Sequence, residues 1–262
     1  MIHLPINESV YQNTKPYPHV SVCDVLDPDF ALNIQNEILS IEDNAWDRYN
    51  NPLEQKYTLR DKNNLPINTQ KLFDILTSEV FVNELSSIVG TQLLNDPDKN
   101  WWGIHKYSNG DYLDIHSDAG NHPKTGQKKH VTLGIYLSKN WSEENNGQLE
   151  IWDGESVVND DAKIHTRITS IIPLFNTLVL FDNTNNAWHG NPDPVKCSKD
   201  NIRIFVTLSY LSEMHRIPYD NMRQKAFFIK RPQDPEDEEK NKIRLMRADK
   251  HQYKNIYGCG KK

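Results

Sequence analysis

The stretch IRIFVTLSYL, residues 202–211, has the alternation of a β-strand with two unlike faces. One face is aliphatic throughout, and its residues are Ile202, Ile204, Val206 and Leu208. The other face is mixed, and its residues are Arg203, Phe205, Thr207 and Ser209. An arginine on an inward face costs free energy unless an anion pairs with it, and no acidic residue shares this face of the strand, since Asp200 lies before it. The strand therefore predicts a core on one side and an anion-binding cavity on the other.

Similar short runs surround this strand from residue 99 onwards. They are separated by turn residues without helical patterns between them, and they read NWWGIHKYS, YLDIH, HVTLGIYLS, QLEIW, RITSIIPL and TLVLFD. Several short strands at this spacing predict an antiparallel barrel or sandwich. In HVTLGIYLS, alternation places His130, Thr132, Gly134 and Tyr136 on one face, so Tyr136 offers a hydroxyl and Gly134 leaves room beside it.

Before residue 99 the sequence predicts mainly helices. Residues 17–26 predict a short strand, and 27–43 predict a helix with Asp27 as its N-cap and Pro28 at its first position. Residues 43–66 are polar and predict an irregular loop or a sheet edge.

The clearest helical stripe runs over residues 68–90, and Gly90 is a natural end for it. Near the C-terminus, residues 235–250 predict a solvated surface helix, because Glu236/Lys240 and Glu238/Lys242 have helical spacing. We therefore expect four parts: an N-terminal arm over 1–16, a helical support region over 17–98, a β core over 99–212 and a charged helical extension over 213–262.

The β core also contains the residues of a possible metal site. His116 and Asp118 lie two apart at the end of a strand, so alternation places both on one face. Alone, such a pair is more often a solvated turn. His189, in NNAWHGNPDPV at the end of another strand-like run, is the best third ligand. Two histidines and one carboxylate with open positions form the facial triad of non-heme Fe(II) oxygenases.

Composition excludes several other classes. The chain has 262 residues, 25% of them charged, and a net charge of −6, which argues against nucleic acid or anionic membranes as partners. No apolar run is long enough to span a membrane, and the N-terminal residues do not resemble a signal peptide. The three cysteines are far apart in sequence, which suits a reducing compartment, so we expect a cytoplasmic protein.

The order of these motifs resembles the Fe(II)/2-oxoglutarate dioxygenases, and within them the prolyl 4-hydroxylase-like group. HKYSNGDYLDIHSD resembles the entry to that group's His-x-Asp pair, and VTLGIYLSKNWSEENNGQLEIWD resembles the strands that follow it. YPHVSVCDVLDPDFALNIQNEI resembles the N-terminal strand and helix of the family. The likeness covers roughly residues 17–212 and is strongest over 101–211.

This resemblance implies a double-stranded β-helix, or jelly-roll, core with flanking helices. Carried over by position, the iron ligands are His116, Asp118 and His189. Arg203 then pairs with the distal carboxylate of 2-oxoglutarate, assisted by Tyr136 and Thr207. Tyr107 lies near the co-substrate or the substrate, although packing alone explains it equally well. The implied cofactors are Fe(II), 2-oxoglutarate and O₂, with ascorbate as an optional addition.

The implied reaction is hydroxylation of an unactivated C–H bond, coupled to decarboxylation of 2-oxoglutarate to succinate and CO₂. The favoured substrate is a prolyl residue of a protein or peptide. A small metabolite or sugar is the second choice, since one scaffold serves many substrates. A metal-binding jelly roll without turnover and a zinc hydrolase remain alternatives, although the hydrolase would not explain an inward Arg203. The sequence does not set the oligomeric state.

Overall fold

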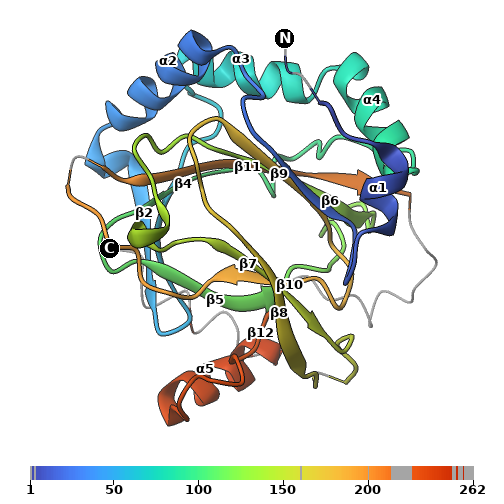
Figure 1. Cartoon of the computed structure of the whole chain (residues 1–262), viewed down its shortest axis with the longest axis vertical. Coiled ribbons are helices and arrows are strands. Elements are labelled where there is room, and N and C mark those ends of the chain that lie inside the picture. Colours follow the sequence, from blue (N-terminus) through green and yellow to red (C-terminus); the bar gives the residue numbers. More distant parts are fainter. Residues whose placement is uncertain are drawn as a thin grey trace.

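The computed structural model describes residues 2, 4–159, 161–199, 201–213, 226–249, 252 and 256. Most of its strands join one antiparallel sheet that curls into a jelly roll, in the order β1-β9-β6-β11-β4-β3-β5-β10-β7-β8. In the described part of the chain, β2 also pairs with β3, and β12 pairs with β5. The predicted fold class is confirmed, and Figure 1 shows two facing layers of strands with helices outside them.

The strands have the following bounds: β1 His19–Val22, β2 Trp46–Asn51, β3 Glu54–Leu59, β4 Gly103–Tyr107, β5 Tyr112–Ser117, β6 Lys128–Tyr136, β7 Leu149–Gly154, β8 Ile164–Ile171, β9 Thr177–Asp182, β10 Trp188–Asn191, β11 Arg203–Ser212 and β12 Phe227–Phe228. The helices are α1 Glu8–Asn13, α2 Pro28–Leu39, α3 Ile67–Leu76, α4 Glu79–Val89 and α5 Glu238–Ala248, with short 3₁₀ turns at Asp43–Ala45 and Glu143–Asn145.

The main hydrophobic core lies between α2–α4 and the aliphatic face of β6, β9 and β11. Ile34 and Ile38 of α2, Leu72 of α3 and Leu85 of α4 are fully buried there. They meet the aliphatic residues predicted from the alternation of β11, such as Ile204. In Figure 1 these three helices lie along one side of the molecule, and α5 lies on the other. The helices therefore support the barrel from outside and leave its interior free for a cavity that polar and aromatic side chains line.

Local capping explains where the helices begin and end. The Asp27 carboxylate accepts a hydrogen bond from the backbone N–H of Phe30, and Pro28 occupies the first position of α2, as predicted. The helix expected over 68–90 is two helices, because the hydroxyl of Ser78 caps a new start at the backbone N–H of Phe81. Gly90 ends α4 with a left-handed φ of 75°.

The polar stretch 43–66, for which we expected an irregular loop or a sheet edge, is more regular than that. It forms the hairpin β2–β3, and β3 is no edge, since it pairs with both β4 and β5. Ion pairs hold it in place, above all the two hydrogen bonds from the Arg48 guanidinium to the buried Asp111 carboxylate. Polar pairing of this kind leaves little hydrophobic alternation for a sequence pattern to show.

The ends of the described chain are also anchored to the barrel. The predicted N-terminal arm contains α1, whose Tyr11 is buried and donates a hydrogen bond to Asp182 at the end of β9.

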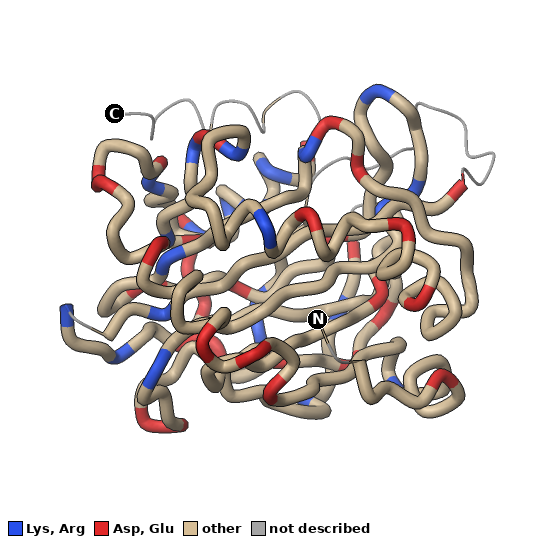
Figure 2. The backbone as a smooth tube through the Cα atoms, turned by 90° about the horizontal axis from the view of Figure 1, so that it is seen from above, with Lys and Arg blue, Asp and Glu red and all other residues tan. Residues whose placement is uncertain are grey.

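No helix in the described part is long and apolar enough to cross a membrane. Cys23 and Cys197 are free thiols, and Cys259 lies outside the described residues. Figure 2 shows acidic and basic residues interleaved along the backbone in that view, without a face of one sign.

Candidate metal centre

A cavity of about 320 Å³ opens inside the barrel, and strands from both layers line it. All seven residues predicted for the site contribute to its wall, namely Tyr107, His116, Asp118, Tyr136, His189, Arg203 and Thr207. The structure thus gathers residues that are up to 100 positions apart in sequence. Their roles as ligands stay predictions.

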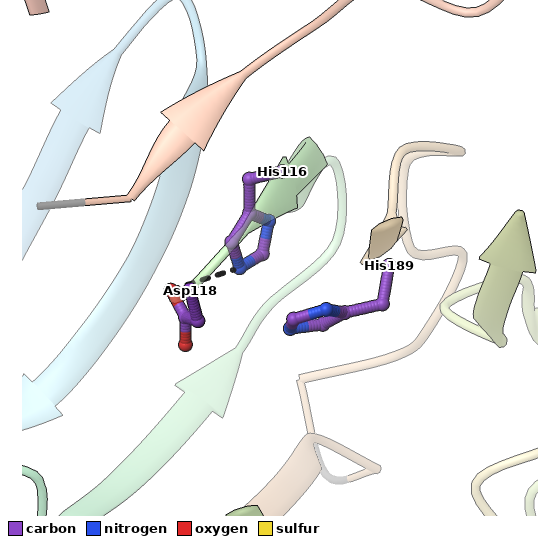
Figure 3. Close-up of side chains that lie close together, drawn as sticks. All are labelled: His116, Asp118 and His189. Carbon is purple, nitrogen blue, oxygen red and sulfur yellow. Dashed lines mark ion pairs between the residues drawn. The ribbon is translucent and has the colours of Figure 1, made fainter. Parts of the chain in front are cut away.

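The possible metal ligands lie together in the wall of this cavity. His116 is on β5, Asp118 directly follows that strand, and His189 is on β10. The two strands are neighbours, and His189 is the register partner of His116. One ligand atom from each of the three residues lies within 4.8 Å of the others, and Figure 3 shows the three side chains converging.

Both histidines are held by their own strands. Nδ1 of His116 lies 2.9 Å from the backbone oxygen of Asp114, and Nδ1 of His189 lies 2.9 Å from that of Ala187. A carbonyl oxygen only accepts, so each Nδ1 carries the hydrogen and donates it. Each Nε2 is then left with a free lone pair. This is the tautomer that a metal ion requires.

Burial keeps both imidazoles neutral. It is the largest influence on each ring, and it lowers the pKa of His116 and that of His189, the latter to about 3. A neutral ring at physiological pH does not have to lose a proton before it binds a cation.

The third group is an ionised carboxylate with one oxygen to spare. Burial alone would raise the pKa of Asp118, but the Lys129 ammonium beside it holds it well below its usual range. Oδ2 of Asp118 accepts a hydrogen bond from Nζ of Lys129 at 2.8 Å, whereas Oδ1 lies 3.6 Å from Nε2 of His116. Two bare imidazole nitrogens and one carboxylate oxygen fit Fe(II) well.

Arg203 lies elsewhere in the cavity wall and is almost wholly buried. Its Nε donates to the backbone oxygen of Gly147 at 2.9 Å, while its Nη1 has no hydrogen-bond partner. None of the carboxylates in the described chain forms an ion pair with it. Its guanidinium carbon stands 4.5 Å from the ring centre of Tyr107 and 5.0 Å from that of Tyr136. A buried guanidinium in this state is suited to an anion that enters the cavity.

The backbone of Gly147 makes this placement of Arg203 possible. Gly147 has a left-handed φ of 74°, and a Cβ atom there would stand 3.0 Å from Cδ of Arg203. A side chain at this position would be strained and would press on the arginine.

The two hydroxyl groups predicted beside Arg203 are in different states. Burial, partly offset by Arg203, raises the pKa of Tyr136 to about 12, so its phenol keeps its hydrogen and remains a donor. The hydroxyl of Thr207 already donates to the backbone oxygen of Leu133 at 2.8 Å. Thr207 would have to break that bond before it could donate to a carboxylate.

Several residues at the site were missed by sequence reasoning. The sequence of residues 122–129 favours a solvated loop, yet Lys129 belongs to β6 and is buried against Asp118. The pairing of β6 with β11 shifts between Tyr210 and Leu211, so that one extra residue, His130, bulges from β6. Such a bulge interrupts the alternation of side chains, which explains why the pattern did not reveal Lys129.

Other missed residues come from β3 and from the chain after residue 226. Glu54 and Lys56 of β3 form an ion pair at 3.0 Å in the cavity wall. The ring of Phe228 lies 5.1 Å from that of His116, and β12 pairs with β5 at this point. Arg247 of α5 also lines the cavity. The expected surface helix is therefore partly a wall of the site, and its Lys240 binds Asp114 instead of Glu236.

Comparison with known proteins agrees with this geometry. Residues 102–210 match the sequence model of a family described as the 2OG-Fe(II) oxygenase superfamily. A search of curated proteins finds no relative.

Similar folds occur among solved structures. A prolyl-4-hydroxylase from Pseudomonas putida has a TM-score of 0.53 and 13% identity, over 79% of this chain and 99% of that one. A prolyl hydroxylase from Trichoplax adhaerens, in complex with a hypoxia inducible factor peptide fragment, has a TM-score of 0.53 and 16% identity, over 78% and 89%. The carbocyclase SnoK from nogalamycin biosynthesis has a TM-score of 0.56 and 11% identity, over 88% and 89%. At these identities the likeness shows a shared fold.

Proposed function

We propose that this chain is a 2-oxoglutarate-dependent dioxygenase, because its residues 102–210 match the sequence model of the 2OG-Fe(II) oxygenase superfamily. In the proposed reaction, 2-oxoglutarate, O₂ and a substrate C–H bond give succinate, CO₂ and a C–OH group. His116, Asp118 and His189 would hold Fe(II), and Arg203 would bind the distal carboxylate of 2-oxoglutarate. When bound, Fe(II) supplies the redox chemistry that divides O₂ between succinate and the hydroxylated product.

The main support for this proposal is that Arg203 is buried and has no anionic partner among the described residues. Its buried guanidinium has an unpaired Nη1 in the same cavity that holds two neutral imidazoles and a carboxylate. One carboxylate of a dicarboxylic acid in this cavity would pair with the guanidinium, and the other end of the acid would be left to bind the metal. A zinc hydrolase needs the three ligands but has no use for the buried cation.

The residues around the reacting centre have separate roles. The two strand carbonyls orient the imidazoles, and Lys129 holds one oxygen of Asp118 so that the other can face the metal. The aromatic rings of Tyr107, Tyr136 and Phe205 surround the guanidinium and exclude water from it. Exclusion of water strengthens the ionic contact with the co-substrate.

For the substrate we propose a prolyl residue of a protein or peptide. Support comes from the resemblance of the motifs to the prolyl 4-hydroxylase-like group, and from the fold shared with two prolyl hydroxylases.

A small metabolite is the second candidate, and the C-terminal segment favours it. Phe228 and Arg247 close part of the cavity wall beside His116, which narrows the space for an extended chain.

Release of succinate tests both candidates. The protein is incubated with Fe(II), 2-oxoglutarate and O₂, and either proline-containing peptides or free metabolites are added. Stimulation by peptides supports the prolyl reading, and stimulation by metabolites alone supports the second. The variant His116→Ala is the control, because it removes a ligand. If both proteins release succinate equally, or neither consumes 2-oxoglutarate under any condition, the proposed function is wrong.

A further inference from the structure

Asn191 is the last residue of β10, two positions after His189, and its side chain also lines the cavity. Two residues along a strand correspond to about 6.6 Å, and the side chains of such residues point to the same side. Pairing with β7 is regular at His189 and Gly190, so β10 itself keeps this alternation. The pairing of β10 with β5 is irregular, since two residues of β10, from His189 to Asn191, span three residues of β5, from His116 to Leu113. The extra residue therefore lies on β5.

The amide of Asn191 differs from the other buried asparagines. Among the described residues three asparagines are buried, Asn176, Asn183 and Asn191. The side-chain nitrogen of Asn176 donates to the backbone oxygen of Leu26, and that of Asn183 donates to the hydroxyl of Thr132. Nδ2 of Asn191 has no hydrogen-bond partner, although the residue is only 3% exposed.

A buried amide that forms no hydrogen bond is costly, and native structures rarely keep one without a purpose. The unpaired Nη1 of Arg203 is a second orphaned donor in the wall of the same cavity. His189 lines this cavity as well, so both unpaired donors share it with the candidate ligands. An oxygen-rich anion that enters the cavity could accept hydrogen bonds from both donors.

We propose that Asn191 is a co-substrate-positioning residue, whose Nδ2 donates a hydrogen bond to a carboxylate oxygen of 2-oxoglutarate. The inference rests on the proposed function and adds a donor that the motifs did not indicate. The unpaired amide destabilises the ligand-free protein, and its hydrogen bond stabilises the complex with 2-oxoglutarate. An apolar side chain of similar size should reverse both effects.

The experiment compares the wild type with Asn191→Leu. Binding of 2-oxoglutarate to the Zn(II)-loaded proteins is measured by calorimetry, which avoids turnover. The melting temperature of each protein is measured without metal and co-substrate. We expect Asn191→Leu to raise the Kd of 2-oxoglutarate about 10- to 100-fold, as for loss of a hydrogen bond to a charged group. Its Zn(II) affinity should stay within about twofold of the wild type, and its melting temperature without ligands should be higher.

Asn176→Leu is the control for 2-oxoglutarate binding, because it replaces a buried asparagine whose amide is used outside the cavity, although leucine is also strained at its left-handed φ of 61°. It should melt at a lower temperature and bind 2-oxoglutarate like the wild type. An unchanged Kd in Asn191→Leu overturns the inference, and so does a parallel loss of Zn(II) binding, which would assign Asn191 to the support of His189. If the wild type itself does not bind 2-oxoglutarate, the proposed function fails instead.

Discussion

At the scale of single residues, the cavity wall contains buried polar groups with hydrogen-bond donors that the protein itself does not use. Arg203 is the clearest example, because its cationic group is enclosed by aromatic rings and lacks an anion among the described residues. The alternation of one strand predicted an inward Arg203, and the structure places this residue in the cavity wall. What the pattern could not show was Lys129, since a bulge changes the phase of β6 next to it.

Replacement of Arg203 should separate co-substrate binding from metal binding. We expect Arg203→Ala to raise the Kd of 2-oxoglutarate roughly 100-fold or more, because a desolvated charge pair is lost. Arg203→Lys should fall between the two, since a lysine keeps the charge but not the two parallel donors. Calorimetry on the Zn(II)-loaded proteins measures both constants. Equal affinity for 2-oxoglutarate in all three proteins would remove Arg203 from the site.

At the scale of elements, polar contacts attach the outer helices to the barrel, and two of them lead to predictions. In one of them, Lys240 and Arg244 of α5 both bind the carboxylate of Asp114 on β5, at 3.1 and 3.0 Å. The sequence predicted α5 from its charges but assigned those charges to solvent. A helical pattern shows which residues share a face, and it does not show which distant strand supplies a counter-charge.

Neutralising Asp114 should loosen α5. We expect Asp114→Asn to lower the free energy of unfolding by roughly 1–3 kcal/mol, because two partly buried cations lose their counter-charge. Urea denaturation measures the loss, and faster hydrogen exchange over residues 238–248 would locate it. Asp74→Asn is the control, because the exposed Asp74 on α3 bonds only to Gln70. Similar, small changes in both variants would show that α5 is held by other contacts.

The second contact predicts a dependence of stability on pH. Burial, partly offset by the hydrogen bond from Tyr11, raises the pKa of Asp182 from its ordinary 3.8 to about 6. The folded state therefore binds the proton more tightly than the unfolded state. The stabilisation is complete below about pH 3.8 and is lost as the pH rises through 6.

Asp182→Asn removes this titration but keeps an oxygen that accepts from Tyr11. Relative to the variant, the wild type should lose up to about 3 kcal/mol of unfolding free energy between pH 4 and pH 7. Urea denaturation of both proteins at a series of pH values measures the difference. If the unfolding free energies of the two proteins change in parallel with pH, the raised pKa of Asp182 is contradicted.

At the scale of the whole molecule, the hydrophobic core and the polar cavity lie on opposite faces of the same strands. The core between α2–α4 and the barrel contains no group of the candidate metal site. The overall architecture was predictable because this division repeats along each strand. The hairpin β2–β3 was not, because ion pairs rather than apolar alternation hold it in the sheet.

Ligands should therefore add stability to a chain that is already folded. We expect a chelator to leave the far-ultraviolet circular dichroism unchanged. Zn(II) should raise the melting temperature, and 2-oxoglutarate should raise it further only when metal is present. A ligand at 100 times its Kd adds about 2.7 kcal/mol. Loss of secondary structure on chelation would show that the metal is needed for folding.

The carbonyl contacts of His116 and His189 have one more consequence. Both rings are oriented by hydrogen bonds to backbone oxygens two residues earlier in the chain, so the centre is preorganised before any ion arrives. Capture of a cation then calls for almost no reorganisation. Amide resonances in an NMR titration with diamagnetic Zn(II) should move only around β5 and β10, while signals from the rest of the barrel stay where they are.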